Sequence, residues 1–376
     1  MKKSEYAKSG VDYTLMEPFK QAMIATGKRT VKFPNKRGVY INQDVMHSHG
    51  AVYEYRGKEA HIWCHTHEDL GNKNWIAEWM RDNAPSVGGV KRTYYEGIGI
   101  DTALMVVNDV IAQGAMPVVF TDQVEVGDSA WFGDVKRSKA LAESFYKICE
   151  EVGMALPAGE SATLKYLIKS EPPVKIAPTL SGSVTGIIAP KERLITGKEL
   201  QAGDHIIAVA SSGVHSNGIS LVIKKALALR EQFLTKLPSG ITLGESALIP
   251  TRSYVKLIES LQQAEVKIHA LLPGTGDGVG KLAFDKRPFT YRIHSWLAVP
   301  ELMQFFRDQG LPLMDCLKTF NWGAGYYIFA PKSEADTILK IGKRAGYTLA
   351  DVGTVETGER QTIFEPENIV LPPPGQ

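Results

Sequence analysis

Strand-like and helix-like segments alternate along the chain, and this alternation limits the fold more than any other feature of the sequence. In the first half, residues 60–64, 116–126 and 179–188 are rich in β-branched and aromatic side chains, as strands are. Residues 100–114 and 136–152 instead place apolar side chains three and four positions apart, as amphipathic helices do. Such an alternation predicts α/β or α+β architecture.

The same alternation resumes after the polar connector PKERLITGKELQAGD (190–204). Because 376 residues exceed one ordinary core, we expect two domains, 1–189 and 190–376. In the second domain we expect strands at HIIAVA, TFNWGAGYYIFAP and TLADVGTV, the last of these being the final strand, and helices at 217–230, 254–263, 298–308 and EADTILKIGKRAG.

Composition excludes several classes of protein. Hydrophobic residues make up 44% and charged residues 22% of the chain, and the net charge is +2, so we expect a soluble globular protein that binds no nucleic acid. No apolar run reaches 18 residues, so we expect no membrane span. The three cysteines are far apart and odd in number, which favours a reduced cytoplasmic setting over a disulfide framework.

The stretch SSGVHSNG (211–218) joins a predicted strand to a predicted helix. Ser216 or Asn217 is expected to cap that helix. The free N–H groups of a helix start favour an anion such as phosphate, and His215 stands where it can donate to that anion. A capped turn with an exposed histidine explains the same residues equally well.

Two acidic segments are weaker signals. In IDTALMVVND, Asp101, Met105 and Asn108 share one helix face and Asp109 is adjacent to it. A carboxylate in so apolar a helix must be exposed, paired or bound to a cation, and exposure is the commonest outcome. In PAGES (157–161), Glu160 is expected to end a short strand, where carboxylates are usually solvated.

The stretch HTHEDLGNK (65–73) is expected to follow a strand as a loop. Alternating histidines on a strand point the same way, so His65 and His67 raise the possibility of a transition-metal pair. Glu68 and Asp69 suit Mg²⁺ and phosphate better, since they are hard oxygen ligands. A solvated polar loop is the third interpretation.

The glycine-rich stretch PGTGDGVGK (273–281) is similar to a phosphate loop but matches no such motif. Thr275 stands where the Walker pattern requires glycine, and Leu282 follows the lysine. Val279 likewise breaks the pattern G-x-G-x-x-G. Two interpretations remain, a flexible loop that approaches a ligand closely and a structural turn.

These stretches occur in an order that resembles one family. YAKSGVDY, GIGIDTALMVVNDVIAQGAMPVVFTD, GDHIIAVASSGVHSNGISLV, ALIPTRSYVKLI and FNWGAGYYIFAP are similar to successive motifs of the phosphoribosylformylglycinamidine cyclo-ligases, from about residue 5 to about residue 356. The resemblance implies a homodimer in which the N-terminal four-stranded sheets of two subunits close a barrel, and a C-terminal α/β sandwich. It also implies that ATP drives ring closure of formylglycinamidine ribonucleotide.

The resemblance also implies roles for individual residues. His215 and Lys73 would act on the phosphates, and Mg²⁺ would bind Asp109 together with Glu68 or Asp69. Glu160 would bind metal or substrate. The remaining implied residues are Asn108, Ser212, Gly213, Asn217 and Gly218 for the nucleotide and Thr275 and Gly276 for the substrate.

Several loops differ from the family pattern. His47 and His49 replace glycines in VMHSHGAVYEY, residues 74–97 contain a helical insertion, and TLKYLI follows the AGESA turn. Two alternatives to the cyclo-ligase therefore stay open. One is another enzyme of the same ATP-binding superfamily with a different substrate, and the other is a non-catalytic ATP-binding relative.

Overall fold

The structure is a computed structural model that describes residues 5–45, 50–86 and 88–375. The chain divides into two compact units. Unit 1 comprises residues 1–110 and 117–191, and unit 2 comprises residues 111–116 and 192–376. His47 and His49 lie outside the described residues.

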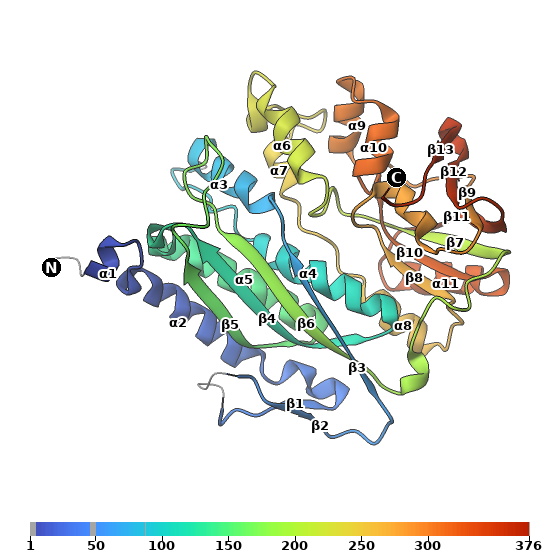
Figure 1. The fold of residues 1–376 in the computed structure, drawn as a ribbon, viewed down its shortest axis with the longest axis horizontal. Coiled ribbons are helices and arrows are strands. Elements are labelled where there is room, and N and C mark those ends of the chain that lie inside the picture. Colours follow the sequence, from blue (N-terminus) through green and yellow to red (C-terminus); the bar gives the residue numbers. More distant parts are fainter. Residues whose placement is uncertain (1–4, 46–49, 87, 376) are drawn as a thin grey trace. The chain divides into compact units, whose positions relative to one another are not determined.

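Unit 1 is built on a four-stranded sheet with helices on one face (Figure 1). Its helices are α1 (Glu5–Lys8), α2 (Tyr13–Thr30), α3 (Lys73–Asn83), α4 (Ile98–Val110) and α5 (Val135–Val152), and its strands are β1 (Val39–Ile41), β2 (Tyr53–Tyr55), β3 (Ile62–Asp69), β4 (Met116–Val126), β5 (Ala155–Thr163) and β6 (Thr179–Ile188). The sheet has the order β3-β6-β4-β5, in which β3 and β6 are antiparallel and β4 and β5 are parallel. Strands β1 and β2 form a separate hairpin.

The helices of unit 1 begin and end where local chemistry dictates. The side chain of Asp134 accepts hydrogen bonds from the backbone at the start of α5, and Gly153 ends that helix in the left-handed region, at a φ of 75°. Asp12 caps α2 in the same way. Phe19 of α2 then packs against Trp131 and Phe132, which fixes this helix against the rest of the unit.

One face of the sheet is buried under helices and the other is open. Along β4, Phe120 and Val124 are fully buried, whereas the alternating positions Thr121 and Gln123 are half-buried. On the buried face, α4 packs on β3 and β6, α2 packs on β5, and Phe145 of α5 contacts Phe120 of β4. The described part of unit 1 forms an open sheet rather than a closed barrel.

Unit 2 contains a seven-stranded sheet in the order β13-β12-β9-β11-β7-β10-β8. Its strands are β7 (Asp204–Ala210), β8 (Ala270–Pro273), β9 (Phe289–Ile293), β10 (Ala324–Pro331), β11 (Leu349–Thr357), β12 (Gln361–Phe364) and β13 (Ile369–Leu371), and its helices are α6 (Ile219–Leu227), α7 (Leu243–Ala247), α8 (Val255–Gln263), α9 (Glu301–Asp308), α10 (Leu313–Thr319) and α11 (Lys332–Arg344). Helix α11 packs on β7, β10 and β11. The sheet is mostly antiparallel, with β9 and β12 as a parallel pair. The mixed α/β two-domain architecture is therefore confirmed.

Some expectations about individual segments were wrong. Residues 65–69 belong to β3 and not to a loop, and Glu160 lies inside β5 and does not end it. Both segments are held by pairing to a neighbouring strand, which a single stretch of sequence does not reveal. TLADVGTV is not the final strand, because β12 and β13 follow it, and α10 was missed.

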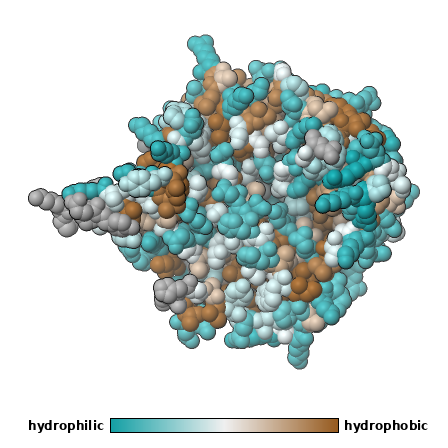
Figure 2. Space-filling model, viewed as in Figure 1, coloured by the Kyte–Doolittle hydropathy of each residue, from teal (hydrophilic) through white to brown (hydrophobic). Residues whose placement is uncertain are grey.

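Within the described residues, no helix is long and apolar enough to span a membrane. On the face shown in Figure 2, hydrophobic residues lie in small patches between hydrophilic ones.

Candidate functional site

The turn between β7 and α6, residues 211–218, is shaped by a buried asparagine that is remote in sequence. Asn321, which is 3% exposed, donates from Nδ2 to the carbonyl of Gly213 at 2.9 Å. Its Oδ1 accepts from the hydroxyl of Ser211 at 3.1 Å and from the N–H of Gly323 at 2.9 Å. The Ser212 hydroxyl is tied separately, to the carbonyl of Pro250 at 2.6 Å. One side chain therefore fixes this turn to the loop before β10.

His215 holds the same turn from inside. Its ring is 4% exposed, and Nε2 accepts from the backbone N–H of Ser212 at 3.2 Å, which places the proton of the neutral ring on Nδ1. The residue has a φ of 58°, an uncommon conformation for a side chain other than glycine. The interpretation as an exposed histidine was wrong. The expected donation to a phosphate stays a prediction, and the ring is already engaged in shaping the turn.

The start of α6 has no side-chain cap, which corrects the expected capping by Ser216 or Asn217. The N-cap is Gly218, with a φ of 74° and no capping hydrogen bond. A Cβ at this position would lie 2.8 Å from the ring of Phe320, so the close approach requires glycine. Ser216 Oγ and Asn217 Nδ2 are buried without a hydrogen-bond partner among the described residues. An uncapped helix start beside two such groups fits an anionic ligand.

The loop 273–281 is a structural turn in large part. A Cβ on Gly274 would lie 2.3 Å from the carbonyl oxygen of Ala324, and one on Gly278 would lie 2.2 Å from that of Leu317. Both glycines are therefore needed for packing. Thr275 accepts a hydrogen bond from Lys281, whereas a Cβ on Gly276 would meet nothing within 4 Å. The loop therefore leaves open space at its tip, at Gly276.

In unit 1, Asp101 is a paired carboxylate and not an exposed one. Lys73 Nζ lies 2.8 Å from Asp101 Oδ1, and both side chains are fully buried. Burial lowers the pKa of Lys73, and the charge of Asp101 opposes that shift. The pair joins the start of α3 to α4. The proposed action of Lys73 on a phosphate stays a prediction, because its ammonium faces Asp101 here.

The other predicted nucleotide and metal residues of unit 1 differ in exposure. On α4, Asn108 is buried and Asp109 is half-buried. On β3, Glu68 pairs across the sheet with Gly182, on the face that packs against Phe120, whereas Asp69 pairs with Ser181 on the open face. Asp69 also accepts from the N–H of Gly71 at 2.6 Å.

The histidines of β3 lie on the open face. His65 Nδ1 is 3.1 Å from the hydroxyl of Thr185, and His67 Nδ1 is 2.8 Å from the hydroxyl of Ser183. Across the described residues, no group of three or more histidine, cysteine, aspartate or glutamate side chains is arranged to hold a metal ion. The transition-metal interpretation therefore has no support in this structure.

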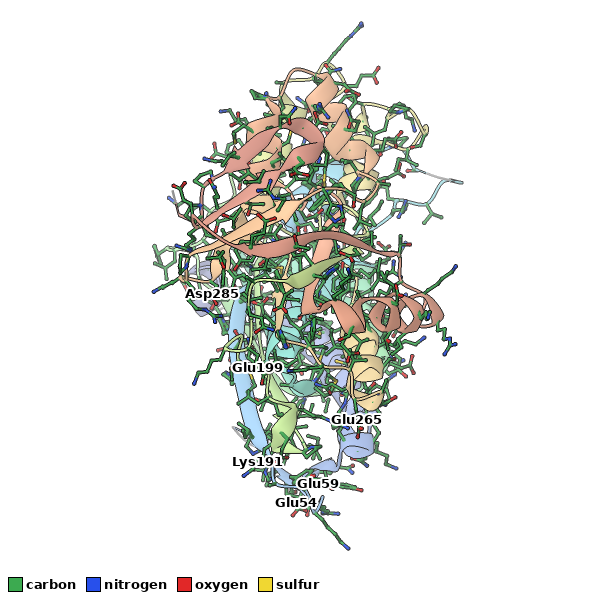
Figure 3. The ribbon with its side chains drawn as sticks, turned by 90° about the vertical axis from the view of Figure 1, so that its right-hand side faces the viewer. Glu54, Glu59, Lys191, Glu199, Glu265 and Asp285 are labelled. Atoms are coloured by element: carbon green, nitrogen blue, oxygen red, sulfur yellow. The ribbon has the colours of Figure 1, made fainter. Side chains whose placement is uncertain are left out.

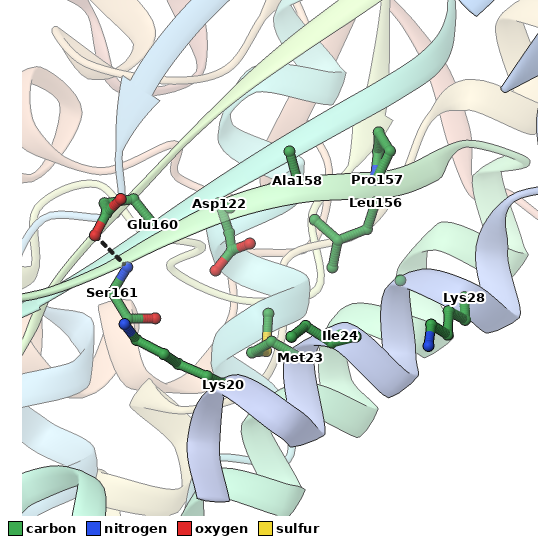
Figure 4. Close-up of a pocket in the computed structure, with 12 residues that line it drawn as sticks. Lys20, Met23, Ile24, Lys28, Asp122, Leu156, Pro157, Ala158, Glu160 and Ser161 are labelled. Carbon is green, nitrogen blue, oxygen red and sulfur yellow. Dashed lines mark hydrogen bonds between the residues drawn. The ribbon is translucent and has the colours of Figure 1, made fainter. Parts of the chain in front are cut away.

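Glu160 and a buried acid that the sequence analysis missed both line a groove between α2 and β5 (Figure 4). The carboxylate of Glu160 is exposed and accepts from the N–H of Ser161 at 2.9 Å. Asp122 is 6% exposed. Burial, together with the nearby charge of Glu160, raises the pKa of Asp122 to about 7.

Two functional candidates were therefore missed, and only one had a signal in the sequence. Asp122 stands in phase with Val118, Phe120 and Val124 along a strand, so alternation alone predicts that it is buried. Asn321 lies in FNWGAGYY before a turn, and no local pattern indicates that it contacts residue 213.

Comparison with known proteins identifies relatives for both halves of the chain. Residues 86–188 match the family described as AIR synthase related protein, N-terminal domain, and residues 201–365 match its C-terminal domain. The phosphoribosylformylglycinamidine cyclo-ligase of Methanobrevibacter smithii is 31% identical over 90% of this chain and 91% of its own length. That of Pyrococcus horikoshii is also 31% identical, over 97% of this chain and 96% of its own.

Solved structures share the fold at lower identity. The hydrogenase maturation protein HypE superposes with a TM-score of 0.60 at 15% identity, covering 92% of this chain and 98% of its own. HypE in complex with ATP gives a TM-score of 0.58 at 14% identity, covering 89% of this chain and 91% of its own.

Proposed function

Because the chain belongs to the phosphoribosylformylglycinamidine cyclo-ligase family, we propose that it uses ATP to convert formylglycinamidine ribonucleotide to aminoimidazole ribonucleotide, with release of ADP and phosphate. The observation that carries this proposal is 31% identity over nearly the whole length of cyclo-ligases. The uncapped start of α6, with buried polar atoms beside it, supports a phosphate-binding role for that turn.

The reaction needs positioning more than covalent chemistry by the protein. The amide oxygen of the substrate attacks the γ-phosphorus of ATP and ADP leaves. The amidine nitrogen then attacks the activated carbon, and phosphate leaves as the ring closes. The protein must hold these groups in line and balance the charge on the transferred phosphoryl group.

In this proposal the β7–α6 turn holds phosphate through its backbone N–H groups and Asn217. His215 acts as a positioning residue, because its Nε2 accepts from the N–H of Ser212 and so fixes the path of the turn. Ser212 and Gly213 are held in place by Pro250 and Asn321. Gly218 at the helix start belongs to the same turn. The assignments of Asn108 on α4 to the nucleotide, and of Thr275 and Gly276 in the 273–281 loop to the substrate, stay predictions.

We assign Asp109 and Glu68 to Mg²⁺, which would neutralise charge on the phosphates when bound. Mg²⁺ commonly takes one or two carboxylates together with phosphate and water, so two carboxylates would suffice to hold it. Glu68 fits better than Asp69, because Asp69 is on the open face of the sheet and engaged by the N–H of Gly71. A metal or substrate role for Glu160 stays a prediction.

The direct test mixes the purified protein with ATP, Mg²⁺ and formylglycinamidine ribonucleotide and detects aminoimidazole ribonucleotide by a diazo colour reaction. Product formation that depends on both ATP and substrate is the expected result. ATP hydrolysis that this ribonucleotide does not stimulate would favour another substrate within the superfamily, and absence of ATP binding would favour neither enzyme.

Asp109→Asn tests the metal assignment. We expect this variant to lose turnover, since the amide cannot balance the charge of Mg²⁺, while Asp336→Asn on the exposed side of α11 keeps it. Unchanged activity of Asp109→Asn would remove the assignment.

We also propose that the chain forms a homodimer through the open face of the sheet of unit 1. This face is lined by polar side chains such as His65, His67 and Gln123. Light scattering should give twice the mass of one chain, and a monomer at the concentration of the activity assay would contradict the shared-barrel architecture.

A further inference from the structure

The α2–β5 groove of unit 1 has a volume of about 200 Å³, which suits a small molecule and not a nucleotide. Helix α2 forms one wall and β5, at the edge of the sheet, forms the other (Figure 4). Its lining residues are Lys20, Met23, Ile24, Gly27, Lys28, Asp122 and residues 156–161.

A buried carboxylate forms the inner surface of this groove. Asp122 projects from β4 between the edge strand and α2 (Figure 4). Gly159 leaves the room for it, because a Cβ there would lie 2.0 Å from Asp122 Oδ1. Among the described residues, the only hydrogen bond to this carboxylate comes from its own backbone N–H. A carboxylate that is 94% buried is costly in its charged form unless a ligand or a proton compensates the charge.

The rest of the lining is balanced in charge. Glu160 adds a second carboxylate, and Lys20 and Lys28 contribute two ammonium groups from α2. Met23 and Leu156 supply apolar surface between them. A lining with two carboxylates and two ammonium groups suits a divalent cation poorly, because the lysines repel it. A ligand with one positive and one negative group matches both sides.

We propose that the α2–β5 groove binds a small aliphatic aminocarboxylate, such as a free α-amino acid, with its ammonium on Asp122 and its carboxylate on Lys20 or Lys28. Charged hydrogen bonds at both ends fix the orientation, and the apolar surface between them accepts an aliphatic side chain. These ligand contacts involve Asp122, Lys20 and Lys28, which the proposed function does not assign to phosphate or Mg²⁺, and their test requires neither ATP nor the ribonucleotide.

Isothermal titration of the whole protein with three probes tests the charge requirement. We expect L-leucine to bind, and isoamylamine and 4-methylpentanoate, which each lack one of its charges, to bind at least about 10-fold more weakly. Equal binding of all three probes, or no binding of L-leucine, would overturn the proposal.

Variants identify the site. Asp122→Asn should weaken L-leucine binding by at least about 10-fold, because the amide carries no charge to pair with the ammonium. Glu59→Gln is the matched control. Glu54 and Glu59 lie at one end of unit 1, and neither lines the groove (Figure 3). Unchanged binding by Asp122→Asn would place the ligand elsewhere.

A second variant leaves the buried acid intact. Ile24 is 42% exposed on α2, so Ile24→Trp can fill the groove without disturbing the core. It should abolish binding of L-leucine while the far-ultraviolet circular dichroism stays that of the wild type. Binding at wild-type affinity by a folded Ile24→Trp would exclude the groove even if Asp122→Asn failed to fold.

Discussion

The β7–α6 turn and the α2–β5 groove both bury polar side chains, but their polar groups have different partners. In the turn, His215 and Asn321 hydrogen-bond to the backbone at Ser212 and Gly213, so burial is compensated within the protein. In the groove, Asp122 has no such partner beyond its own backbone among the described residues. His215 and Asn321 therefore shape the turn through bonds within the protein. Asp122, in contrast, remains able to bind a ligand.

The Lys73–Asp101 pair offers the largest test of this difference. Removing Lys73 would take away the positive charge that lies 2.8 Å from the fully buried carboxylate of Asp101. We expect Lys73→Met to lower the free energy of unfolding by about 3–5 kcal/mol, measured by chemical denaturation. The double variant Lys73→Met/Asp101→Leu should recover much of this loss in unfolding free energy. A loss below about 1 kcal/mol in Lys73→Met alone would show that water or a rearranged side chain compensates the charge of Asp101.

The pH dependence of stability tests Asp122 itself. Its folded pKa is about 7, above the ordinary aspartate value, so the folded state holds a proton that the unfolded chain has released. The associated stability is fully present below the unfolded pKa and is lost as pH rises through about 7. The loss amounts to about 4 kcal/mol.

Comparison with Asp122→Asn isolates this contribution. The asparagine has no proton to release, so the difference in unfolding free energy between wild type and variant should change between about pH 4 and pH 8, in favour of the variant at high pH. Parallel curves for the two proteins would mean that the acid is solvated or paired in solution.

His215→Ala tests the turn. The substitution removes the acceptor for the Ser212 N–H and leaves a residue that is less suited to a φ of 58°. Because a small misplacement of phosphate-binding groups is costly, we expect kcat to fall about 100-fold. His215→Asn should recover part of it, since asparagine tolerates this conformation and can accept the hydrogen bond. A change in KM alone would mean that the turn contributes only to uniform binding.

The β7–α6 turn could be located from the sequence because its residues are contiguous and occur in a fixed order relative to the other family motifs. A strand, small residues and a helix follow one another within residues 204–227, and the family that this order indicated is confirmed by the relatives. The capping was predicted wrongly. Gly218 is at the N-cap because Phe320, a hundred residues away in sequence, leaves no room for a Cβ.

The α2–β5 groove could not be predicted from sequence patterns. Helix α2 was not anticipated, since Pro18 lies inside it and its buried surface rests on a few residues such as Met16 and Phe19. Without that helix, Asp122 would lie on an uncovered face of the sheet. The strand pattern alone indicates that Asp122 faces inward, but not that a ligand-sized space lies beside it.

Asn217→Ala gives the smallest effect and the finest distinction between shaping and binding. Asn217 Nδ2 is buried without a partner among the described residues, so its removal should change the free energy of unfolding by less than about 0.5 kcal/mol. If the amide donates to a phosphate, the KM for ATP should rise about 5-fold, equivalent to about 1 kcal/mol. Ser212→Ala is the matched contrast, because its hydroxyl already donates to Pro250 and its loss should cost stability of about 1 kcal/mol. If Asn217→Ala lost stability with no change in the KM for ATP, Asn217 would be a residue that shapes the turn, like His215 and Asn321. Phosphate would then be bound by the backbone N–H groups of α6 alone.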